Sequence, residues 1–237
     1  MKSELLSLLY PRRCPICEDI VRQKEGLIHE ECRQQLYFIK EPRCMKCGKP
    51  IEDENQEYCF DCHGKKLSYI KGFPCIKYDS NMSKSIAAFK YKSKKEYADF
   101  YVDEILKEYK SIFLRLQFDA LVPVPIHVSK YKERGYNQAE LIANGIGKQI
   151  NVPVESAMLI RNRKTLPQKE LNDKERLKNL QEAFEIRNEY KYSKYQRVLL
   201  VDDIYTTGST VETCAKLLRT VGVGEVYYTS VCIGQGY

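Results

Sequence analysis

Apolar positions recur along the chain after residue 66 with two different periods. Short apolar runs are typical of buried strands, whereas segments such as 97–113 place Phe100, Tyr101, Ile105 and Tyr109 near one face of a helix. Strands alternating with helices indicate an α/β domain with a mostly parallel sheet flanked by helices. The pattern predicts strands at 73–78, 118–125, 198–201 and 225–233, and helices at 82–91, 97–113, 137–150 and 209–221.

One segment interrupts this alternation. Residues 161–178 contain seven Lys or Arg residues, three acidic residues and almost no periodicity. A stretch of this length without regular structure is either functional or disordered in a compact domain. On composition alone, a solvated run of charges is the simpler interpretation.

The composition is that of a folded protein with one large domain or two smaller ones. The chain has 237 residues, of which 43% are hydrophobic and 30% charged. No apolar run approaches the roughly 18 residues that a membrane span needs. The first ten residues include Glu4 and lead into Pro11 without a small-residue cleavage site, so we expect a cytoplasmic protein and not a secreted one.

Charge and cysteine divide the chain into two regions. Residues 1–66 hold twelve basic and twelve acidic residues, so the excess of +7 lies in residues 67–237. Seven of the ten cysteines, in contrast, fall within residues 14–62. We therefore predict a small domain at 1–66 and a larger one at 67–237.

The amino-terminal cysteines form a repeat with an offset of 30 residues. Each unit reads C-x2-C-x11-[HC]-x2-C and supplies four ligands in two close pairs, as a tetrahedral zinc site requires. Metal binding would also provide folding energy to a region with few large aliphatic residues. We predict two structural Zn2+ sites, one formed by Cys14, Cys17, His29 and Cys32 and the other by Cys44, Cys47, Cys59 and Cys62.

A disulfide framework is the alternative interpretation, but it requires an oxidising compartment. The short spacing favours sequential pairing within each unit, although spacing alone also allows a cross-brace arrangement. His63 follows Cys62 directly and is either a bystander or a competing ligand. Seven thiolates and two Zn2+ would bring residues 1–66 to a formal charge of about −3, which makes this region a poor nonspecific clamp for DNA.

The sharpest motif is residues 198–210, where an apolar strand is followed by Asp202 and Asp203 and then by a turn that opens a helix. Free amides at a helix N-terminus attract phosphate, and ligands of parallel sheets bind at the carboxyl ends of the strands. The adjacent carboxylates suit vicinal hydroxyls or Mg2+, so the motif describes a site for a ribose 5-phosphate. The turn consists of Thr206, Thr207, Gly208, Ser209 and Thr210.

An ordinary helix N-cap would also explain a Thr or Ser in this turn. It would not explain two aspartates after an apolar strand, because buried carboxylates are costly unless they meet cations or hydroxyls. The sequence contains neither G-x-x-x-x-G-K-[ST] nor a G-x-G-x-x-G that opens a helix, which argues against P-loop and dinucleotide-binding proteins. Tyr205, between the aspartates and the turn, either stacks on a substrate or packs in the core.

These thirteen residues resemble the 5-phosphoribosyl-1-pyrophosphate (PRPP) signature of type I phosphoribosyltransferases. The chain as a whole resembles the ComF family of bacterial competence-related proteins, in which a double zinc ribbon precedes such a domain. His29 departs from the family pattern, which more often has cysteine there, but it remains a zinc ligand type. Besides the cysteine pairs and the signature, the resemblance is carried by residues 89–92, 122–125, 133–140 and 165–168, with Arg176, Asn179 and Phe184.

The resemblance implies a type I phosphoribosyltransferase fold and a role for each motif. Asp202 and Asp203 would hold the ribose hydroxyls directly or through Mg2+, and residues 206–210 the 5-phosphate. Residues 161–178 would form the mobile loop that closes over PRPP and excludes water, which replaces the interpretation as a charge run. The candidate cations for the pyrophosphate and this loop are Lys130, Lys132, Arg134, Arg161, Arg163 and Lys164.

Two functions follow as hypotheses. The first is a PRPP- and Mg2+-dependent pentosyltransferase of nucleoside metabolism with an unidentified acceptor, associated with natural competence and DNA uptake. The second is a non-catalytic factor on the same scaffold that binds single-stranded DNA and competence proteins, since basic grooves with aromatic platforms suit single strands. Lysine-rich helix faces are more often simply solvated. The residues for this surface are Lys84, Lys90, Lys92, Lys94 and Lys95, interleaved with Phe89, Tyr91 and Tyr97.

Overall fold

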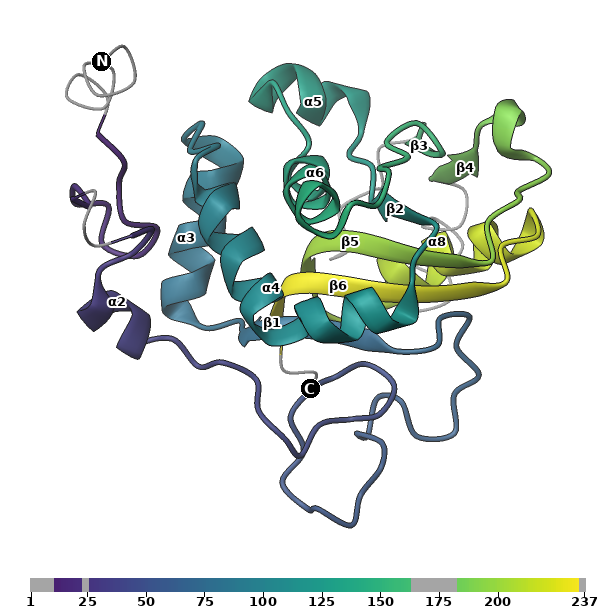
Figure 1. Cartoon of the computed structure of the whole chain (residues 1–237), viewed down its shortest axis with the longest axis horizontal. Coiled ribbons are helices and arrows are strands. Elements are labelled where there is room, and N and C mark those ends of the chain that lie inside the picture. Colours follow the sequence, from purple (N-terminus) through teal and green to yellow (C-terminus); the bar gives the residue numbers. More distant parts are fainter. Residues whose placement is uncertain (1–10, 23–25, 163–182, 235–237) are drawn as a thin grey trace, which may run out of the picture.

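The computed structural model describes residues 11–22, 26–162 and 183–234 and is built around a four-stranded sheet (Figure 1). The strand order is β1-β6-β5-β2, and all three neighbouring pairs are parallel. The predicted parallel sheet is therefore confirmed. Its strands are β1 (Gly72–Lys77), β2 (Ala120–Pro123), β5 (Arg197–Tyr205) and β6 (Glu225–Ile233).

Helices cover both faces of this sheet, as the apolar character of its strands requires. Successive residues of β5 belong to opposite cores: Leu199 and Val201 pack with α4 and α6, and Val198 and Leu200 pack with α8. Figure 1 shows α8 behind the sheet and the other long helices in front of it. The four helices lie close to their predicted ranges: α3 (Ser80–Tyr91), α4 (Tyr97–Leu116), α6 (Gln138–Ile150) and α8 (Ser209–Thr220).

Several short elements were not predicted. Helix α5 (Val128–Arg134) has no buried residue, so it carries no apolar stripe that a sequence pattern could reveal. Strands β3 (Leu159–Arg161) and β4 (Phe184–Ile186) form a two-stranded antiparallel sheet of only three residues each. The remaining elements are α2 (Glu30–Gln34) and the 3-10 helix Asn188–Tyr190. Most of the basic stretch 161–178, including Arg163 and Lys164, lies outside the described residues.

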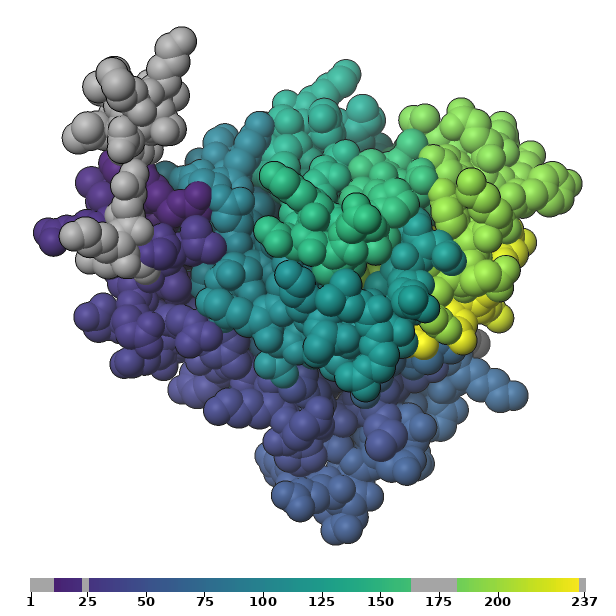
Figure 2. Space-filling model, viewed as in Figure 1, coloured from purple at the N-terminus to yellow at the C-terminus, as the bar shows by residue number. Residues whose placement is uncertain are grey.

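The amino-terminal region packs against the rest of the molecule (Figure 2), and its middle part lies along the β1 edge of the sheet. Between the two cysteine units, Phe38 forms an antiparallel bridge with Ile76 of β1. The amide of Ile39 donates to the Cys75 carbonyl at 2.9 Å, and the Lys77 amide donates to the Tyr37 carbonyl at 2.8 Å. This connector covers an edge that would otherwise present unpaired backbone groups.

Each cysteine unit extends a different core. Cys14 and Cys32 of the first unit belong to the core that contains α3, α4 and α6, whereas all four cysteines of the second unit belong to the core that contains α8. The two units therefore support opposite faces of the same sheet. Both cores contain residues from either side of the predicted boundary at residue 66.

Candidate functional site

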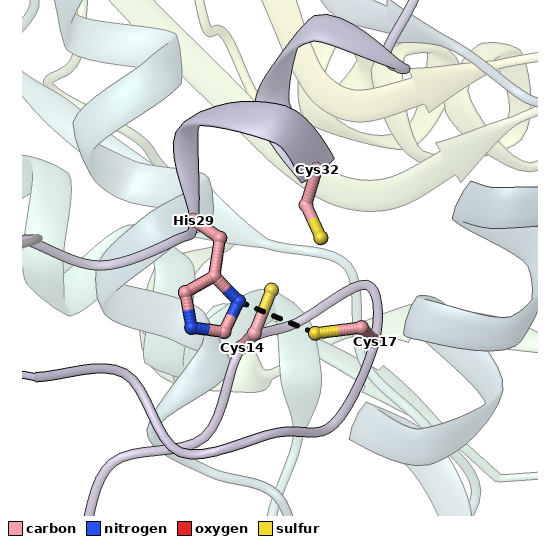
Figure 3. A group of neighbouring side chains, drawn as sticks. All are labelled: Cys14, Cys17, His29 and Cys32. Carbon is pink, nitrogen blue, oxygen red and sulfur yellow. Dashed lines mark hydrogen bonds between the residues drawn. The ribbon is translucent and has the colours of Figure 1, made fainter.

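The first cysteine unit brings Cys14, Cys17, His29 and Cys32 together, with one ligand atom of each within 4.8 Å of all the others (Figure 3). His29 Nδ1 lies 3.3 Å from the Cys17 sulfur, and Nε2 lies 3.1 Å from the Ile20 carbonyl. Because a carbonyl can only accept, Nε2 carries the proton and Nδ1 offers its lone pair to the cluster. This second contact fixes the ring as in the outer shell of many zinc sites.

The second unit places Cys44, Cys47, Cys59 and Cys62 within the same 4.8 Å limit, and all four are buried. All ten cysteines of the chain are free thiols, so the disulfide alternative has no support in the structure. Pairing is sequential within each unit and not cross-braced, which resolves the alternative left by the spacing. His63 is exposed and belongs to neither cluster. Both sets offer four nitrogen or sulfur ligands in one place, which fits tetrahedral Zn2+.

The phosphate motif lies where β5 ends and α8 begins. Strand β5 continues through Asp202 and Asp203 to Tyr205, four residues further than the apolar run predicted. Gly208 is the N-cap of α8 with a φ of 80°, and a Cβ at this position would lie 2.2 Å from the Tyr205 hydroxyl oxygen. Glycine is therefore required here both for the backbone conformation and for space.

A cavity of about 290 Å³ opens at the carboxyl ends of β2 and β5. It brings together seven of the residues that the sequence assigned to the phosphate and pyrophosphate site, and their charges are those expected for an anionic ligand with a bound cation. Thr207, Gly208 and Ser209 belong to the adjoining turn but not to the cavity wall, and Lys132 does not line it. The seven are Asp202, Asp203, Thr206, Thr210, Lys130, Arg134 and Arg161.

Lys90 of α3 also lines this cavity, and its ammonium lies 2.5 Å from an Asp203 carboxylate oxygen. Burial acts to lower the pKa of Lys90, but the charge of Asp203, its hydrogen bond and the charge of Asp202 together outweigh burial, and the pKa is raised. Burial raises the pKa of Asp202, and the neighbouring Asp203 charge raises it further, to about 8. Two adjacent carboxylates are hard oxygen donors of the type that Mg2+ prefers.

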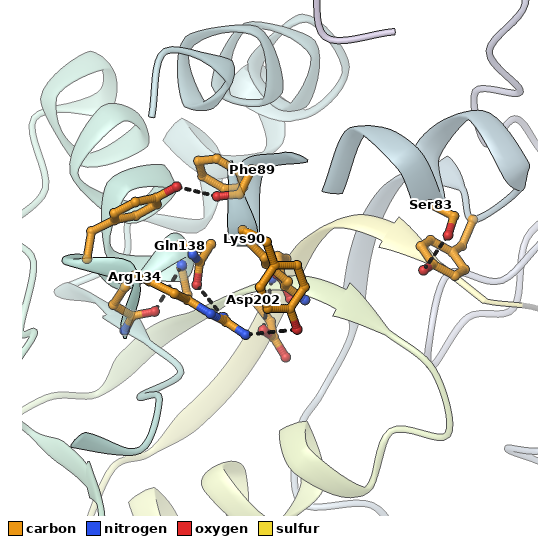
Figure 4. A network of polar contacts seen from close by, with 12 residues as sticks. Ser83, Phe89, Lys90, Arg134, Gln138 and Asp202 are labelled. Carbon is orange, nitrogen blue, oxygen red and sulfur yellow. Dashed lines mark hydrogen bonds and ion pairs between the residues drawn. The ribbon is translucent and has the colours of Figure 1, made fainter. Parts of the chain in front are cut away.

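Arg134 and Gln138 form a polar pair in the same wall, and Figure 4 shows them with Lys90 near Asp202. Arg134 Nη1 donates to Gln138 Oε1 at 2.9 Å, and Nη2 donates to the Tyr91 hydroxyl at 3.2 Å. The Gln138 side chain is 2% exposed, and its Nε2 has no hydrogen-bond partner among the described residues. A buried amide donor of this kind is available to a ligand oxygen.

Comparison with known proteins places both regions in described families. The double zinc ribbon domain family matches residues 5–63, and the phosphoribosyl transferase domain family matches residues 137–233.

Several known proteins are similar to this chain over most of their length. Competence protein F from Haemophilus influenzae is 29% identical over 222 residues, which are 90% of this chain and 93% of that protein. Competence protein ComFC from Bacillus subtilis is 26% identical over 198 residues, which are 81% and 77% of the two chains. The chain belongs to the ComF family. DNA utilization protein YhgH from Salmonella typhimurium is similar too, with 26% identity over 223 residues, or 92% and 89% of the two chains.

For this ComF-family protein, the predicted fold class is confirmed: a type I phosphoribosyltransferase fold follows an amino-terminal double zinc ribbon. Within the described residues, no helix combines the length and the apolar character needed to cross a membrane. The ribbon family and the two ligand clusters together support Zn2+ as the metal of the amino-terminal region.

Sequence reasoning missed two residues of the ComF cavity, Lys90 and Gln138. Both occur in stretches that carry the family resemblance, but neither was assigned to the site. Lys90 follows Ala88 and Phe89, which are 2% and 0% exposed, and a lysine next to such buried neighbours signals an ion pair in the interior.

The predicted surface for single-stranded DNA is wrong at three positions. Phe89 and Tyr97 are 0% and 1% exposed and belong to the core, so neither can stack on a base. Lys90 is paired with Asp203 inside the cavity. Of the aromatic residues proposed for this surface, only Tyr91 is exposed.

Proposed function

We propose that this ComF-family protein binds PRPP with Mg2+ and transfers its phosphoribosyl group to an acceptor, as a pentosyltransferase. The observation that carries the proposal is one cavity in which the carboxylates of Asp202 and Asp203 lie beside the phosphate turn and several cationic side chains. A sugar with a phosphate at one end and a charged leaving group at the other fits this distribution. The phosphoribosyl transferase family match to residues 137–233 supports the same assignment.

Each part of the cavity has a role in this proposal. The turn at residues 206–210 and the N-terminus of α8 hold the 5-phosphate. Asp202 and Asp203 hold the ribose hydroxyls and stabilise the positive charge that develops on the ribosyl carbon as the bond to pyrophosphate loosens. Lys130, Arg134 and Gln138 hold the pyrophosphate. Asp202 and Asp203 would be the protein ligands of Mg2+, which would neutralise part of the negative charge of the pyrophosphate leaving group.

Calorimetric titration with PRPP and Mg2+ tests the proposal. We expect the wild type to bind and the double variant Asp202→Asn/Asp203→Asn to lose most of its affinity. The control is Glu52→Gln/Asp53→Asn, which alters another adjacent acidic pair that is exposed on the second zinc unit. Absence of binding to the wild type, or equal binding to both double variants, would overturn the proposal.

A second candidate function, binding of single-stranded DNA, is favoured by one observation at the rim of the cavity. Tyr91 is 62% exposed, and the Arg134 guanidinium lies 4.9 Å from the centre of its ring. Lys92 and Lys95 are exposed beside it. The competence and DNA utilization names of the relatives support a role connected with DNA, and a transferase could also act close to a bound strand.

A salt series with single-stranded DNA tests this second function. Tyr91→Ala is expected to weaken binding by about tenfold, because stacking of a base on an aromatic ring contributes roughly 1–3 kcal/mol. Tyr192→Ala, at a tyrosine that is 96% exposed, is the control and is expected to have no effect. An affinity that does not change with salt concentration would exclude a surface that follows the phosphate backbone.

A further inference from the structure

Three buried tyrosines connect the second zinc unit with the phosphate turn. The rings of Tyr205 in β5 and Tyr228 in β6 are stacked, with centroids 4.8 Å apart and planes 8° apart. Tyr69, which precedes β1, meets the Tyr228 ring edge-on at 5.1 Å, and its hydroxyl lies 2.9 Å from that of Tyr205. The three side chains form one closely packed group.

On the side of the second zinc unit, Tyr228 and β1 contact backbone carbonyls of the Cys44–Cys47 segment, which we call the knuckle. The Tyr228 hydroxyl donates to the carbonyl of the ligand residue Cys47 at 2.7 Å. The Gly72 amide of β1 donates to the Lys46 carbonyl at 2.8 Å. A Cβ at Gly72 would lie 2.2 Å from the Tyr228 ring, so the knuckle, β1 and the ring are in direct contact.

The other end of the group supports the phosphate turn. The hydroxyl of Tyr205 occupies the space directly beside Gly208, where even a methyl group would overlap it. Glu212, in the first turn of α8, accepts hydrogen bonds from the amide and hydroxyl of Ser68 at 2.8 and 2.7 Å. Ser68 is the neighbour of Tyr69, so the segment that follows the second zinc unit contacts both the turn and the helix it opens.

The first zinc unit makes a comparable contact, but with a tyrosine in the core on the other face of the sheet. The hydroxyl of Tyr97 in α4 donates to the carbonyl of the ligand residue Cys14 at 3.2 Å. Tyr97 belongs to the core on the opposite face of the sheet from α8 and the tyrosine group. Both units are thus attached through a tyrosine hydroxyl to a ligand residue's carbonyl, but among the described residues only the second unit is attached to the phosphate turn.

We propose that Tyr69, Tyr205 and Tyr228 are positioning residues that couple metal binding at the second zinc unit, and not at the first, to the geometry of the phosphate turn. Loss of the metal would release the Cys47 carbonyl from Tyr228 and loosen the packing beneath Gly208. A phosphate site depends on amides held in a fixed orientation, so such loosening weakens binding at the turn. The identity of the ligand rests on the proposed function, but the coupling itself does not.

Hydrogen exchange of the turn tests the coupling without any ligand. Cys59→Ser removes a ligand of the second unit, and Cys17→Ser removes one of the first; each variant is expected to retain one zinc ion per chain. We expect amides in residues 206–212 to exchange at least tenfold faster in Cys59→Ser and at the wild-type rate in Cys17→Ser. Equal exchange rates in the two variants would overturn the proposal.

A second variant separates positioning from general stability and does not depend on metal loss. Tyr205→Phe keeps the stacked ring and removes only the hydroxyl beside Tyr69 and Gly208. We expect about tenfold weaker binding of ribose 5-phosphate, in line with the loss of one buried hydrogen bond, and unchanged binding of magnesium pyrophosphate. Tyr97→Phe, the matched control at the first unit, is expected to leave both affinities unchanged.

The outcomes of this second experiment are distinct. If Tyr205→Phe lowers the affinities for both ligands equally, the effect is a general structural one. If neither affinity changes, a positioning role is excluded. If the wild type binds neither ligand, the proposed function fails, while exchange in residues 206–212 of Tyr205→Phe still decides the coupling. If Cys59→Ser does not fold, hydrogen exchange of residues 206–212 in Tyr205→Phe is the test of the coupling in its place.

Discussion

Asp202 and Asp203 are adjacent in sequence but differ in their surroundings. Asp203 forms an ion pair with the Lys90 ammonium at 2.5 Å, whereas Asp202 accepts a hydrogen bond from the Asp203 amide at 2.8 Å. Burial, followed by the Asp203 charge, therefore raises the pKa of Asp202 to about 8. The surroundings of Asp202 therefore favour its protonated form before any ligand arrives.

The raised pKa makes the stability of the ligand-free protein depend on pH. Since the pKa of Asp202 is about 8 in the folded chain and 3.8 in the absence of perturbation, the folded chain holds a proton between these two values that the unfolded chain has lost, and the stability from this proton falls as pH rises through this range. We expect the unfolding free energy to fall between pH 6 and 8 by up to about 1.4 kcal/mol per pH unit, and Asp202→Asn to lack this decline. Urea unfolding at pH 6, 7 and 8 measures it. If the unfolding free energies of the wild type and Asp202→Asn differ by the same amount at all three pH values, the raised pKa does not belong to Asp202.

Lys90 acts as an internal counter-ion of the carboxylate pair, so its removal has two expected effects. Lys90→Gln leaves Asp203 without its ammonium partner, and we expect a loss of roughly 1–3 kcal/mol of stability. The affinity of the ligand-free protein for Mg2+ is expected to rise roughly tenfold, because the cation no longer competes with lysine. Titration with Mg2+ measures the second effect. Lys92→Gln, which alters an exposed pair with Glu18, is the control, and unchanged Mg2+ affinity in Lys90→Gln would contradict the competition.

At the scale of elements, the β5–turn–α8 unit was largely predictable because its information is local. An apolar run, an acidic pair and a Thr/Gly/Ser turn are consecutive in the sequence, and the structure places them in that order. The extension of β5 to Tyr205 was not predictable, since Asp202 to Tyr205 are held by pairing with β6 and not by an apolar pattern. Lys90 and Gln138 reach the cavity from α3 and α6, and only tertiary packing brings these helices to the same sheet end.

Gly208 gives a direct test of the turn geometry. In Gly208→Ala, the alanine would be strained at this positive φ and its Cβ would clash with Tyr205. We expect a stability loss of about 1–3 kcal/mol, and a larger loss of affinity for ribose 5-phosphate than for magnesium pyrophosphate. Gly26→Ala is the matched control, because Gly26 has a φ of 82° but no atom within 4 Å of its Cβ position. Denaturation and titration of both variants measure the difference. Equal effects of the two substitutions would show that the Tyr205 contact is unimportant.

At the scale of the whole molecule, the zinc units are parts of two continuous cores. The metal ligands were predictable because their spacing is local, and the structure brings together the two predicted sets. The attachment of the ribbons to the sheet was not predictable, because its contacts join residues far apart in sequence. Arg33 of α2 donates to both carboxylate oxygens of Glu104 in α4, at 3.2 and 3.0 Å, and Phe38 pairs with Ile76.

The Arg33–Glu104 pair is expected to hold the first unit on α4. Glu104 is 2% exposed, so Arg33→Met leaves a buried carboxylate with only Lys107 as a cationic partner among the described residues. We expect a loss of about 1–3 kcal/mol in urea unfolding, less than for a fully buried pair because Arg33 itself is partly exposed. Arg13→Met is the control, because the Arg13 guanidinium is exposed where it donates a hydrogen bond to the Glu18 carbonyl. Equal losses in the two variants would argue against a special role of Glu104.

The connector at the β1 edge has a consequence for the chain when zinc is scarce. Residues 37–39 are held against β1 between Cys32 and Cys44, which are ligands of different metal sites. Without metal at either end, we expect residues 37–39 to be held less firmly, which would expose the backbone groups of β1 to pairing with another chain. Zinc shortage would then appear first as intermolecular β-pairing and precipitation. The supply of metal during synthesis would thus set how much of the protein stays in solution.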